Sequence, residues 1–420
     1  MLISFKMKNY RSFKEEVVFT MEAEPSKLKL QNIADITLAN KSQQRIVKAA
    51  LIFGANASGK TNLIRAFYAL INSIMIKPKV DDRVRMYDPF LFDKKTMLGN
   101  ISFELVFVVA QSIKYEYKVI FNRYEIFEEI LNRLPSGKNS NLFTRVRSSE
   151  PDIYLGKLGE NFDNKEIKVF KNQLLLSKFG DDEPIEELTN IFKYFRNWDI
   201  INATNSLHRS NIETWVSQAV YSNPELYKKL TSLLKFADTK LQGFEVVNLK
   251  EDKNISISKP NKPFIVLGRH NLYDDLNDTG ELVSLPFDNE SLGTQVLYGL
   301  GGQLIQTLET GGVLIIDELD TSLHPFITRM ILMMFQSPKL NTKNAQIIFT
   351  THDVTLLDRD LVRRDQVWIS EKKANGCSDL FSLQDFDGVR EETAFDKWYL
   401  AGKFGGLPSI KSIDSIFEDE

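Results

Sequence analysis

The sequence predicts an α/β fold built on a mixed, largely parallel sheet, with an antiparallel β lobe and a helical insertion. Three observations predict it. A glycine-rich loop at 54–61 lies between an apolar run and a segment with helical periodicity. A second apolar run, at 313–316, is typical of a strand at the buried centre of a parallel sheet. Polar and apolar residues alternate within 100–130, which indicates half-exposed antiparallel strands.

The 420-residue chain is expected to divide into three regions. Residues 1–130 form an N-terminal lobe with β-strands and the glycine-rich loop. Residues 131–285 form an insertion, largely helical at about 163–240 and flanked by strands. Residues 286–420 form a C-terminal lobe. The insertion lacks a dense stripe of lysine and arginine, which favours a packing role over a nucleic-acid-binding arm. Its helical periodicity is found near 165–177, 185–197, 211–220 and 223–237.

The composition, with 43% hydrophobic and 26% charged residues, is that of a globular protein with a sizeable core. A net charge of −3 gives no general attraction to nucleic acid, although a local basic groove stays possible. The single cysteine, Cys377, excludes an internal disulfide and suits a reducing compartment. No targeting segment and no apolar run near the ~20 residues needed to cross a bilayer are visible. We therefore expect a cytoplasmic location and no membrane partner.

Residues 54–61 read G-x-x-x-x-G-K-T, the pattern of a phosphate-binding loop. Gly54 and Gly59 allow the backbone to curl and to direct N–H groups at phosphate oxygens. Lys60 can reach the β- and γ-phosphates, and the Thr61 hydroxyl can bind Mg²⁺. The helix that follows adds the positive end of its dipole. A chance glycine-rich turn is the alternative, but the strand before and the helix after favour the phosphate loop. The other loop residues expected to contact the nucleotide are Asn56 and Ser58.

An apolar strand at 313–316 ends in Asp317 and Glu318. Asp317 can hold Mg²⁺, directly or through water. Glu318 can polarise a water molecule for attack on the γ-phosphate. Taken alone, two acids at the end of a buried strand have an equally good structural explanation. The phosphate loop earlier in the chain favours the functional one.

Two further segments can contact the nucleotide. His352 follows the strand at 346–351 and can sense the γ-phosphate. The order of phosphate loop, acidic strand and histidine strand favours this role over a structural one. Ser291 is a good N-cap, and together with Gly293 it could hold a triphosphate at a helix start, although a simple capped helix has the same pattern. For His270 we favour a structural hydrogen bond. The four histidines and one cysteine lack ligand spacing, so no metal besides Mg²⁺ is expected.

Together these segments resemble the ABC-type, AAA-family ATPase heads of the SMC, Rad50 and RecF kind. The segments that carry the resemblance are Phe5–Phe13, Gly54–Asn62, Ser291–Gln295, Asp317–Glu318, Asp320–Pro325 and His352. Within this group the chain is most similar to the stand-alone RloA-like and AbiL-type ATPases of bacterial phage-defence systems. That closer similarity also includes residues 236–238, 290–294, 363–368 and 399–406.

The resemblance implies a dimer that clamps ATP and Mg²⁺ between two protomers. One protomer supplies Lys60, Glu318 and His352 for catalysis, and Thr61 and Asp317 for the metal. Ser291 and Gly293 of the second protomer close over the γ-phosphate, and the turn at 320–324 couples the two sites. Arg11 and Asn62 are also implied as nucleotide contacts. Two features depart from the family pattern: Ser-Leu-Gly replaces paired glycines in the signature, and the lobe-joining glutamine is not placed, with Gln111 only a candidate.

The resulting functional hypothesis is an ATPase whose nucleotide-driven dimerisation is a conformational switch. We expect it to be the sensor subunit of an anti-phage, abortive-infection type system with a separately encoded RloB-like or Toprim-type effector. About seventy residues follow His352, too few for an appended nuclease domain, which favours a separate effector. The alternative is a RecF-like DNA-repair ATPase, in which nucleic acid is the partner. An energiser of a membrane transporter ranks last.

Overall fold

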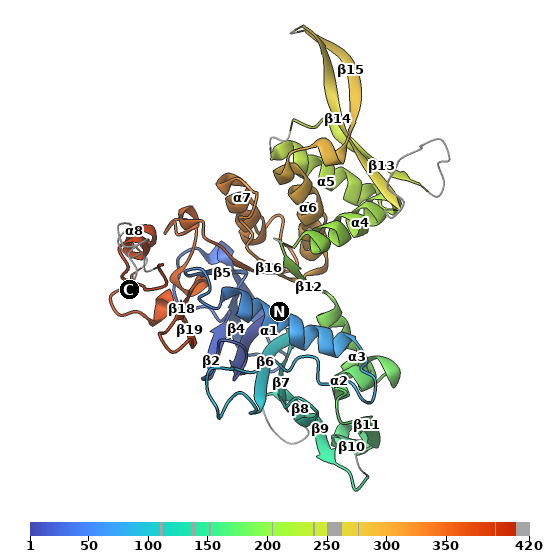
Figure 1. Ribbon diagram of the computed structural model, residues 1–420, viewed down its shortest axis with the longest axis vertical. Coiled ribbons are helices and arrows are strands. Elements are labelled where there is room, and N and C mark those ends of the chain that lie inside the picture. Colours follow the sequence, from blue (N-terminus) through green and yellow to red (C-terminus); the bar gives the residue numbers. More distant parts are fainter. Residues whose placement is uncertain are drawn as a thin grey trace, which may run out of the picture. The chain divides into compact units, whose positions relative to one another are not determined.

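The computed structural model describes residues 1–109, 112–135, 140–150, 153–203, 205–237, 240–249, 263–275, 277–390 and 392–408 (Figure 1). The chain forms two compact units. Unit 1 comprises Met1–Trp198 and Ile348–Glu420, and unit 2 comprises Asp199–Ile347. Within the described residues, no helix is long and apolar enough to cross a bilayer. The elements confirm the α/β class, with a mixed sheet, an antiparallel sheet and a helical region.

Unit 1 contains an eight-stranded antiparallel sheet in the order β11-β10-β9-β8-β7-β6-β1-β2. Its strands are β1 (Leu2–Lys8), β2 (Val17–Thr20), β6 (Ile101–Val109), β7 (Ile113–Phe121), β8 (Ile126–Leu134), β9 (Asn141–Arg147), β10 (Ile153–Leu158) and β11 (Glu166–Phe170). Burial alternates along β6 and β7, which confirms the antiparallel strands expected there. The buried face includes Phe5, whose ring centroid lies 4.4 Å from that of Phe67.

The phosphate-loop region of unit 1 is built on a second sheet, in which β17, β5, β18 and β19 are successive strands. β18 is parallel to β5 and antiparallel to β19. All five residues of β5 are buried, which explains its continuous apolar run. The strands are β5 (Ala49–Phe53), β17 (Gln346–Thr350, from Ile348 in this unit), β18 (Val367–Lys372) and β19 (Ser378–Ser382). A separate hairpin pairs β3 (Ile33–Thr37) with β4 (Gln43–Val47).

The helices of unit 1 are α1 (Lys60–Met75), α2 (Leu175–Ser177) with a π-helical turn at Lys178–Asp182, α3 (Glu186–Arg196) and α8 (Phe395–Leu400). Helix α1 buries Leu63, Phe67 and Leu70, as its periodicity predicts. The expected helix near 185–197 is confirmed as α3. A helix across 165–177 is wrong, because Glu166–Phe170 forms β11. Its Glu-Ile-Lys-Val-Phe sequence alternates exposed and buried side chains, and strand periodicity therefore decides its structure.

Unit 2 combines helices with two groups of strands. A three-stranded antiparallel sheet has the order β13-β14-β15, and β12, β16 and the start of β17 are neighbours in the other group. The strands are β12 (Trp198–Asn202, from Asp199 in this unit), β13 (Gly243–Asn248), β14 (Phe264–Asp274), β15 (Asn277–Pro286) and β16 (Val313–Asp317). The helices are α4 (Ser206–Ser222), α5 (Pro224–Phe236), α6 (Leu292–Thr310) and α7 (Pro325–Gln336). The helices expected near 211–220 and 223–237 are therefore confirmed.

Glycines on α6 allow α4 and α5 to pack closely against it. A Cβ atom at Gly302 would lie 2.5 Å from Val216 Cγ2 of α4. A Cβ atom at Gly301 would lie 2.7 Å from Leu230 Cδ1 of α5. Both distances are far below ordinary van der Waals contact, so a side chain at either position would displace Val216 or Leu230 or would separate the helices.

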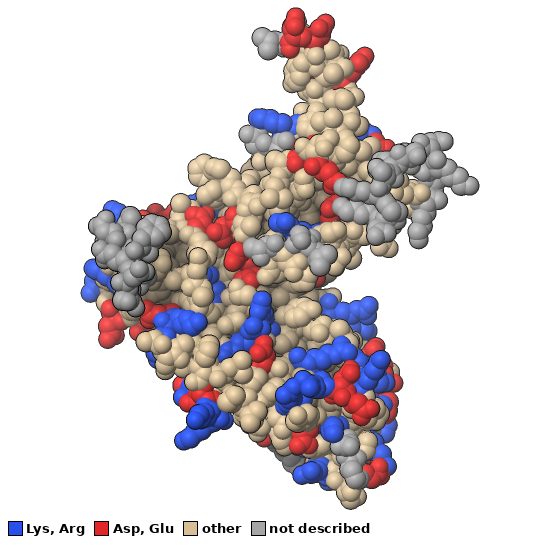
Figure 2. All heavy atoms as spheres, viewed as in Figure 1, with Lys and Arg blue, Asp and Glu red and all other residues tan. Residues whose placement is uncertain are grey.

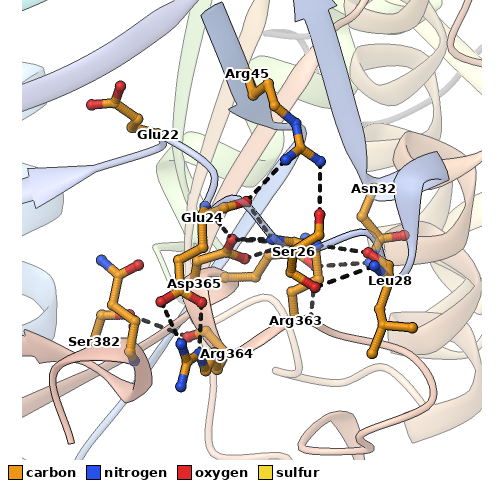
Figure 3. A network of polar contacts seen from close by, with 12 residues as sticks. Glu22, Glu24, Ser26, Leu28, Asn32, Arg45, Arg363, Arg364, Asp365 and Ser382 are labelled. Carbon is orange, nitrogen blue, oxygen red and sulfur yellow. Dashed lines mark hydrogen bonds and ion pairs between the residues drawn. The ribbon is translucent and has the colours of Figure 1, made fainter. Parts of the chain in front are cut away.

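A buried polar network in unit 1 joins the 22–32 segment to the residues that lead into β18 (Figure 3). The Arg363 side chain is fully buried, and its Nη2 lies 2.6 Å from Asp365 Oδ2. Its Nη1 donates to the Leu28 carbonyl at 2.6 Å. The neighbouring Arg364 forms a two-pronged ion pair with Glu24 at 2.6 and 2.8 Å. Segments more than 300 residues apart in sequence are thus fixed together by paired charges.

We expect Arg363→Leu to lower the free energy of unfolding by about 3–5 kcal/mol, because it leaves the Asp365 carboxylate buried without its partner. Urea denaturation, monitored by tryptophan fluorescence, measures the decrease in the free energy of unfolding. The double variant Arg363→Leu/Asp365→Leu removes both charges and should recover part of it. A single-variant loss below about 1 kcal/mol contradicts this account of the network.

We expect Asp199, which lies on β12, to make the free energy of unfolding depend on pH. Burial raises the pKa of Asp199 from 3.8 to about 6. The folded state therefore favours the neutral acid, so its stability is highest below the unfolded pKa and falls as pH rises from about 4 to about 6. The expected loss is about 3 kcal/mol. Asp199→Asn should flatten this part of the profile and be the more stable protein at pH 7. A profile unchanged by the substitution contradicts the prediction.

Candidate nucleotide-binding site

The loop after β5 in unit 1 has a backbone that only glycine suits at its two ends. Gly54 has φ +148° and Gly59 has φ +121°. A Cβ atom at Gly54 would lie 2.3 Å from the Ser370 carbonyl oxygen, and one at Gly59 would lie 2.5 Å from Ser378 Oγ. Both the dihedral angle and the lack of space therefore require glycine. Gly59 directly precedes α1, so the loop leads into a helix N-terminus as the motif predicts.

Lys60 lies across this loop. Its Nζ donates hydrogen bonds to the carbonyl oxygens of Gly54 at 2.8 Å and Ala55 at 3.1 Å. The residue is buried, so these polar partners hold the ammonium inside the curve of the loop. An anion placed in the loop would meet this charge.

Serines from segments distant in sequence form hydrogen bonds that hold the backbone of the loop at Ser58. Ser370 Oγ on β18 donates to the Ser58 carbonyl at 3.0 Å, and Ser378 Oγ on β19 lies 2.5 Å from the same oxygen. Ser12 Oγ lies 2.8 Å from Ser378 Oγ and accepts a hydrogen bond from Asn62 Nδ2 at 2.7 Å. Sequence reasoning missed the three serines, although Ser12 lies in the 5–13 segment. Asn62, expected at the nucleotide, contacts this support.

Two of the remaining expected residues of unit 1, Asn56 and Thr61, lie on the loop and at its end. Asn56 is exposed at the loop tip, and Thr61 is half-buried in the first turn of α1. Arg11 has φ +52°, and its Nη1 lies 2.8 Å from Asp88 Oδ2. Residues 399–406 also lie beside the loop: a Cβ atom at Gly406 would be 3.4 Å from Gly54 Cα. The sequence analysis named residues 399–406 as part of the family resemblance but did not predict that they lie beside the loop.

His352 lies just after the end of β17, which is the neighbour of β5 in the sheet. The Thr351 N–H donates to the Ile52 carbonyl at 3.1 Å, so the chain reaches His352 beside the strand that starts the phosphate loop. The His352 side chain is exposed. Asp353 caps the short helical turn that follows by accepting from the Thr355 N–H at 3.0 Å. In unit 1, the phosphate loop and His352 therefore follow the ends of two adjacent strands, β5 and β17.

In unit 2, the buried Asp317 at the end of β16 has partners on β12 and directly after it. Asn202 Nδ2 donates to Asp317 Oδ2 at 3.2 Å, and the Ala203 N–H donates to the Asp317 carbonyl at 3.1 Å. Sequence reasoning missed Asn202, because nothing in its local sequence places it next to β16. Glu318 follows in the left-handed region with φ +59°, a conformation that costs a non-glycine residue of order 1 kcal/mol. Such strain is often found where a side chain has a functional orientation.

The predicted signature segment begins α6 of the same unit. Ser291 Oγ accepts from the Thr294 N–H at 3.1 Å, which confirms it as the N-cap. A Cβ atom at Gly293 would lie 2.9 Å from the Ser322 carbonyl oxygen, so this glycine allows the 320–324 turn to approach the helix start. Ser291 and Leu292 are exposed. The lobe-joining candidate Gln111 lies outside the described residues.

The model of one protein family, described as "AAA domain, putative AbiEii toxin, Type IV TA system", matches residues 49–358. Among solved structures, the chain is similar to the SMC head domain from Thermotoga maritima, with 14% identity, a TM-score of 0.43 and coverage of 91% of this chain and 98% of that chain. It is also similar to the recombination mediator protein RecF-ATPrS of the RecFOR pathway, with 14% identity, a TM-score of 0.34 and the same coverage. No curated protein matches the chain.

Proposed function

The chain belongs to the family described as "AAA domain, putative AbiEii toxin, Type IV TA system", and on that basis we propose that it binds ATP with Mg²⁺ and hydrolyses it. The observation that carries the proposal is the loop between β5 and α1. Its two end glycines leave room only for backbone, and the Lys60 ammonium lies on the loop carbonyls. A glycine-rich loop of this kind, with a lysine and a helix start beside it, supports the binding of a polyphosphate chain.

We propose a role for each polar group. Lys60 binds the β- and γ-phosphates, and the loop N–H groups hold the same oxygens. Thr61 and Asp317 supply a hydroxyl and a carboxylate oxygen, the hard ligands that Mg²⁺ prefers, and the ion neutralises phosphate charge. Glu318 accepts a proton from the attacking water, and His352 orients the γ-phosphate. Asn202 keeps the Asp317 carboxylate in one orientation.

We further propose that two copies close over ATP, with Ser291 and Gly293 of the partner copy completing the site. The exposed Ser291 at a capped helix start supports this, because the first N–H groups of a helix attract phosphate oxygens. The family description names a toxin–antitoxin system, which supports a partner protein for this ATPase. We propose that the chain serves phage defence and that this partner is a separately encoded RloB-like or Toprim-type effector.

A phosphate-release assay with ATP and Mg²⁺ tests both proposals when it includes Ser291→Arg. A bulky cation at the exposed N-cap should block closure, so turnover should fall by roughly 100-fold while ATP still binds. Size-exclusion chromatography with ATP should show a monomer even when Ser291→Arg is combined with Glu318→Gln, a change expected to trap the closed dimer. Ser222→Arg, at an exposed serine that ends α4, is the matched control and should keep wild-type turnover. Full turnover by a monomeric Ser291→Arg protein contradicts closure by a second copy.

A further inference from the structure

The β14–β15 hairpin of unit 2 extends away from helices α4–α6 (Figure 1). β13 pairs with β14 up to Arg269, and beyond that residue the hairpin is a two-stranded ribbon. Its register pairs His270 with Val283 and Asn271 with Leu282. All ten residues of β15 are exposed. In the described part of unit 2, β15 pairs only with β14, so its other edge presents backbone N–H and C=O groups to solvent.

Apolar side chains are exposed on both faces of this ribbon. Side chains alternate along β15, so Leu282 lies on one face and Val283 and Leu285 lie on the other. Leu282 is 52% exposed, and on β14 Tyr273 is 57% exposed. A two-stranded ribbon without a core is marginally stable in water, and exposed apolar clusters on a single chain mark interaction sites. A second protein would bury these side chains.

The charge of the ribbon identifies the partner's chemistry. Residues 270–290 contain no lysine or arginine. Asp274, Asp275, Asp278 and Glu281 lie toward its end, and Figure 2 shows acidic side chains at the far tip. Nucleic acid and an identical ribbon of a second copy are both disfavoured by like charge, whereas a basic protein surface is attracted.

The base of the ribbon is fixed next to the start of α6. His270 Nε2 lies 2.7 Å from Glu290 Oε1, which agrees with the structural role expected for this histidine. A Cβ atom at Gly268 would lie 2.5 Å from the same carboxylate oxygen, so glycine is needed for Glu290 to reach the ribbon. Arg269 pairs with Glu245 of β13 at 2.7 Å. A fixed base with an exposed end suits an arm that presents a preformed strand to a partner.

We propose that the β14–β15 hairpin is a docking arm for a partner protein whose contact segment is extended and apolar with flanking lysine or arginine. The segment adds a strand to the open edge of β15, and its cations pair with Asp278 and Glu281. This goes beyond the proposed ATPase activity and does not depend on it.

Site-specific photo-crosslinking in cells of the native host tests the proposal. The photoreactive residue p-benzoylphenylalanine replaces Leu282 in the full-length chain, and Leu98, which is exposed in unit 1, takes it as the matched control position. Both positions are exposed, so folding should be preserved. We expect position 282, but not position 98, to crosslink to a single protein other than this chain. The crosslinked peptide of that protein should be rich in lysine or arginine. Adding Glu281→Lys should reduce the yield by about fivefold, and Glu281→Gln by less.

Several outcomes overturn the proposal. The proposal is wrong if position 282 gives no protein crosslink, or if it crosslinks to a second copy of this chain or to nucleic acid. It is also wrong if the crosslinked peptide has no excess of positive charge. A yield that Glu281→Lys leaves unchanged also overturns it. Because the crosslink is scored without measuring ATP turnover, a failed ATPase assay does not affect this test, and a failed crosslink does not affect the ATPase proposal.

Discussion

Lys60→Ala is expected to abolish measurable ATP turnover and to weaken ATP binding by roughly 100-fold, a loss of about 3 kcal/mol. The Lys60 ammonium is buried on the carbonyls of Gly54 and Ala55, inside the curve where phosphate oxygens would lie. Its removal takes away the one lysine charge of the loop motif and the hydrogen bonds that Lys60 donates to the two loop carbonyls. Isothermal titration with ATP measures binding, and phosphate release measures turnover.

Lys27→Ala is the control for this result, because Lys27 is an exposed lysine of unit 1 outside the loop. It should bind and hydrolyse ATP as the wild type does. Circular dichroism of Lys60→Ala should match that of the wild type, because the loop glycines and supporting serines stay in place. Wild-type binding by Lys60→Ala would show that the phosphate loop does not hold the nucleotide.

Glu318→Gln is expected to separate binding from hydrolysis. The amide keeps the size of the side chain but cannot accept a proton from water, so turnover should fall by roughly 100- to 10,000-fold. ATP binding should change little, and the ATP-bound dimer should accumulate on size-exclusion chromatography. The backbone strain at Glu318, with φ +59°, is shared by both residues and does not confound the comparison.

Glu225→Gln, at an exposed glutamate in the first turn of α5, controls for the loss of one negative charge in unit 2. It should hydrolyse ATP at the wild-type rate and form no stable dimer. Normal hydrolysis by Glu318→Gln means that another group accepts the proton. Slow hydrolysis without dimer accumulation would separate the catalytic role of Glu318 from the proposed switch.

The phosphate loop and α1 could be predicted because their signals are local. The glycine positions, Lys60 and the apolar period of the helix all lie within about 20 consecutive residues, and the structure places each as expected. The buried strands β5 and β16 were predicted for the same reason, since a continuous apolar run marks the centre of a parallel sheet.

Features that depend on distant residues could not be predicted. Ser370 and Ser378 support a loop more than 300 residues earlier, and serine on a strand has no pattern that indicates such a partner. Asn202 meets Asp317 only because β12 and β16 are neighbours, and strand order is not contained in local periodicity. The segment at 166–170 was misassigned because a short amphipathic run fits both a helix and a strand until its neighbour β10 is known.

A crystal structure of Glu318→Gln with ATP and Mg²⁺ would show whether two copies share the nucleotide. We expect two copies that enclose each triphosphate, with Lys60 of one copy and Ser291 of the other both contacting it. A triphosphate held entirely by one chain, or bound away from Lys60, contradicts the account.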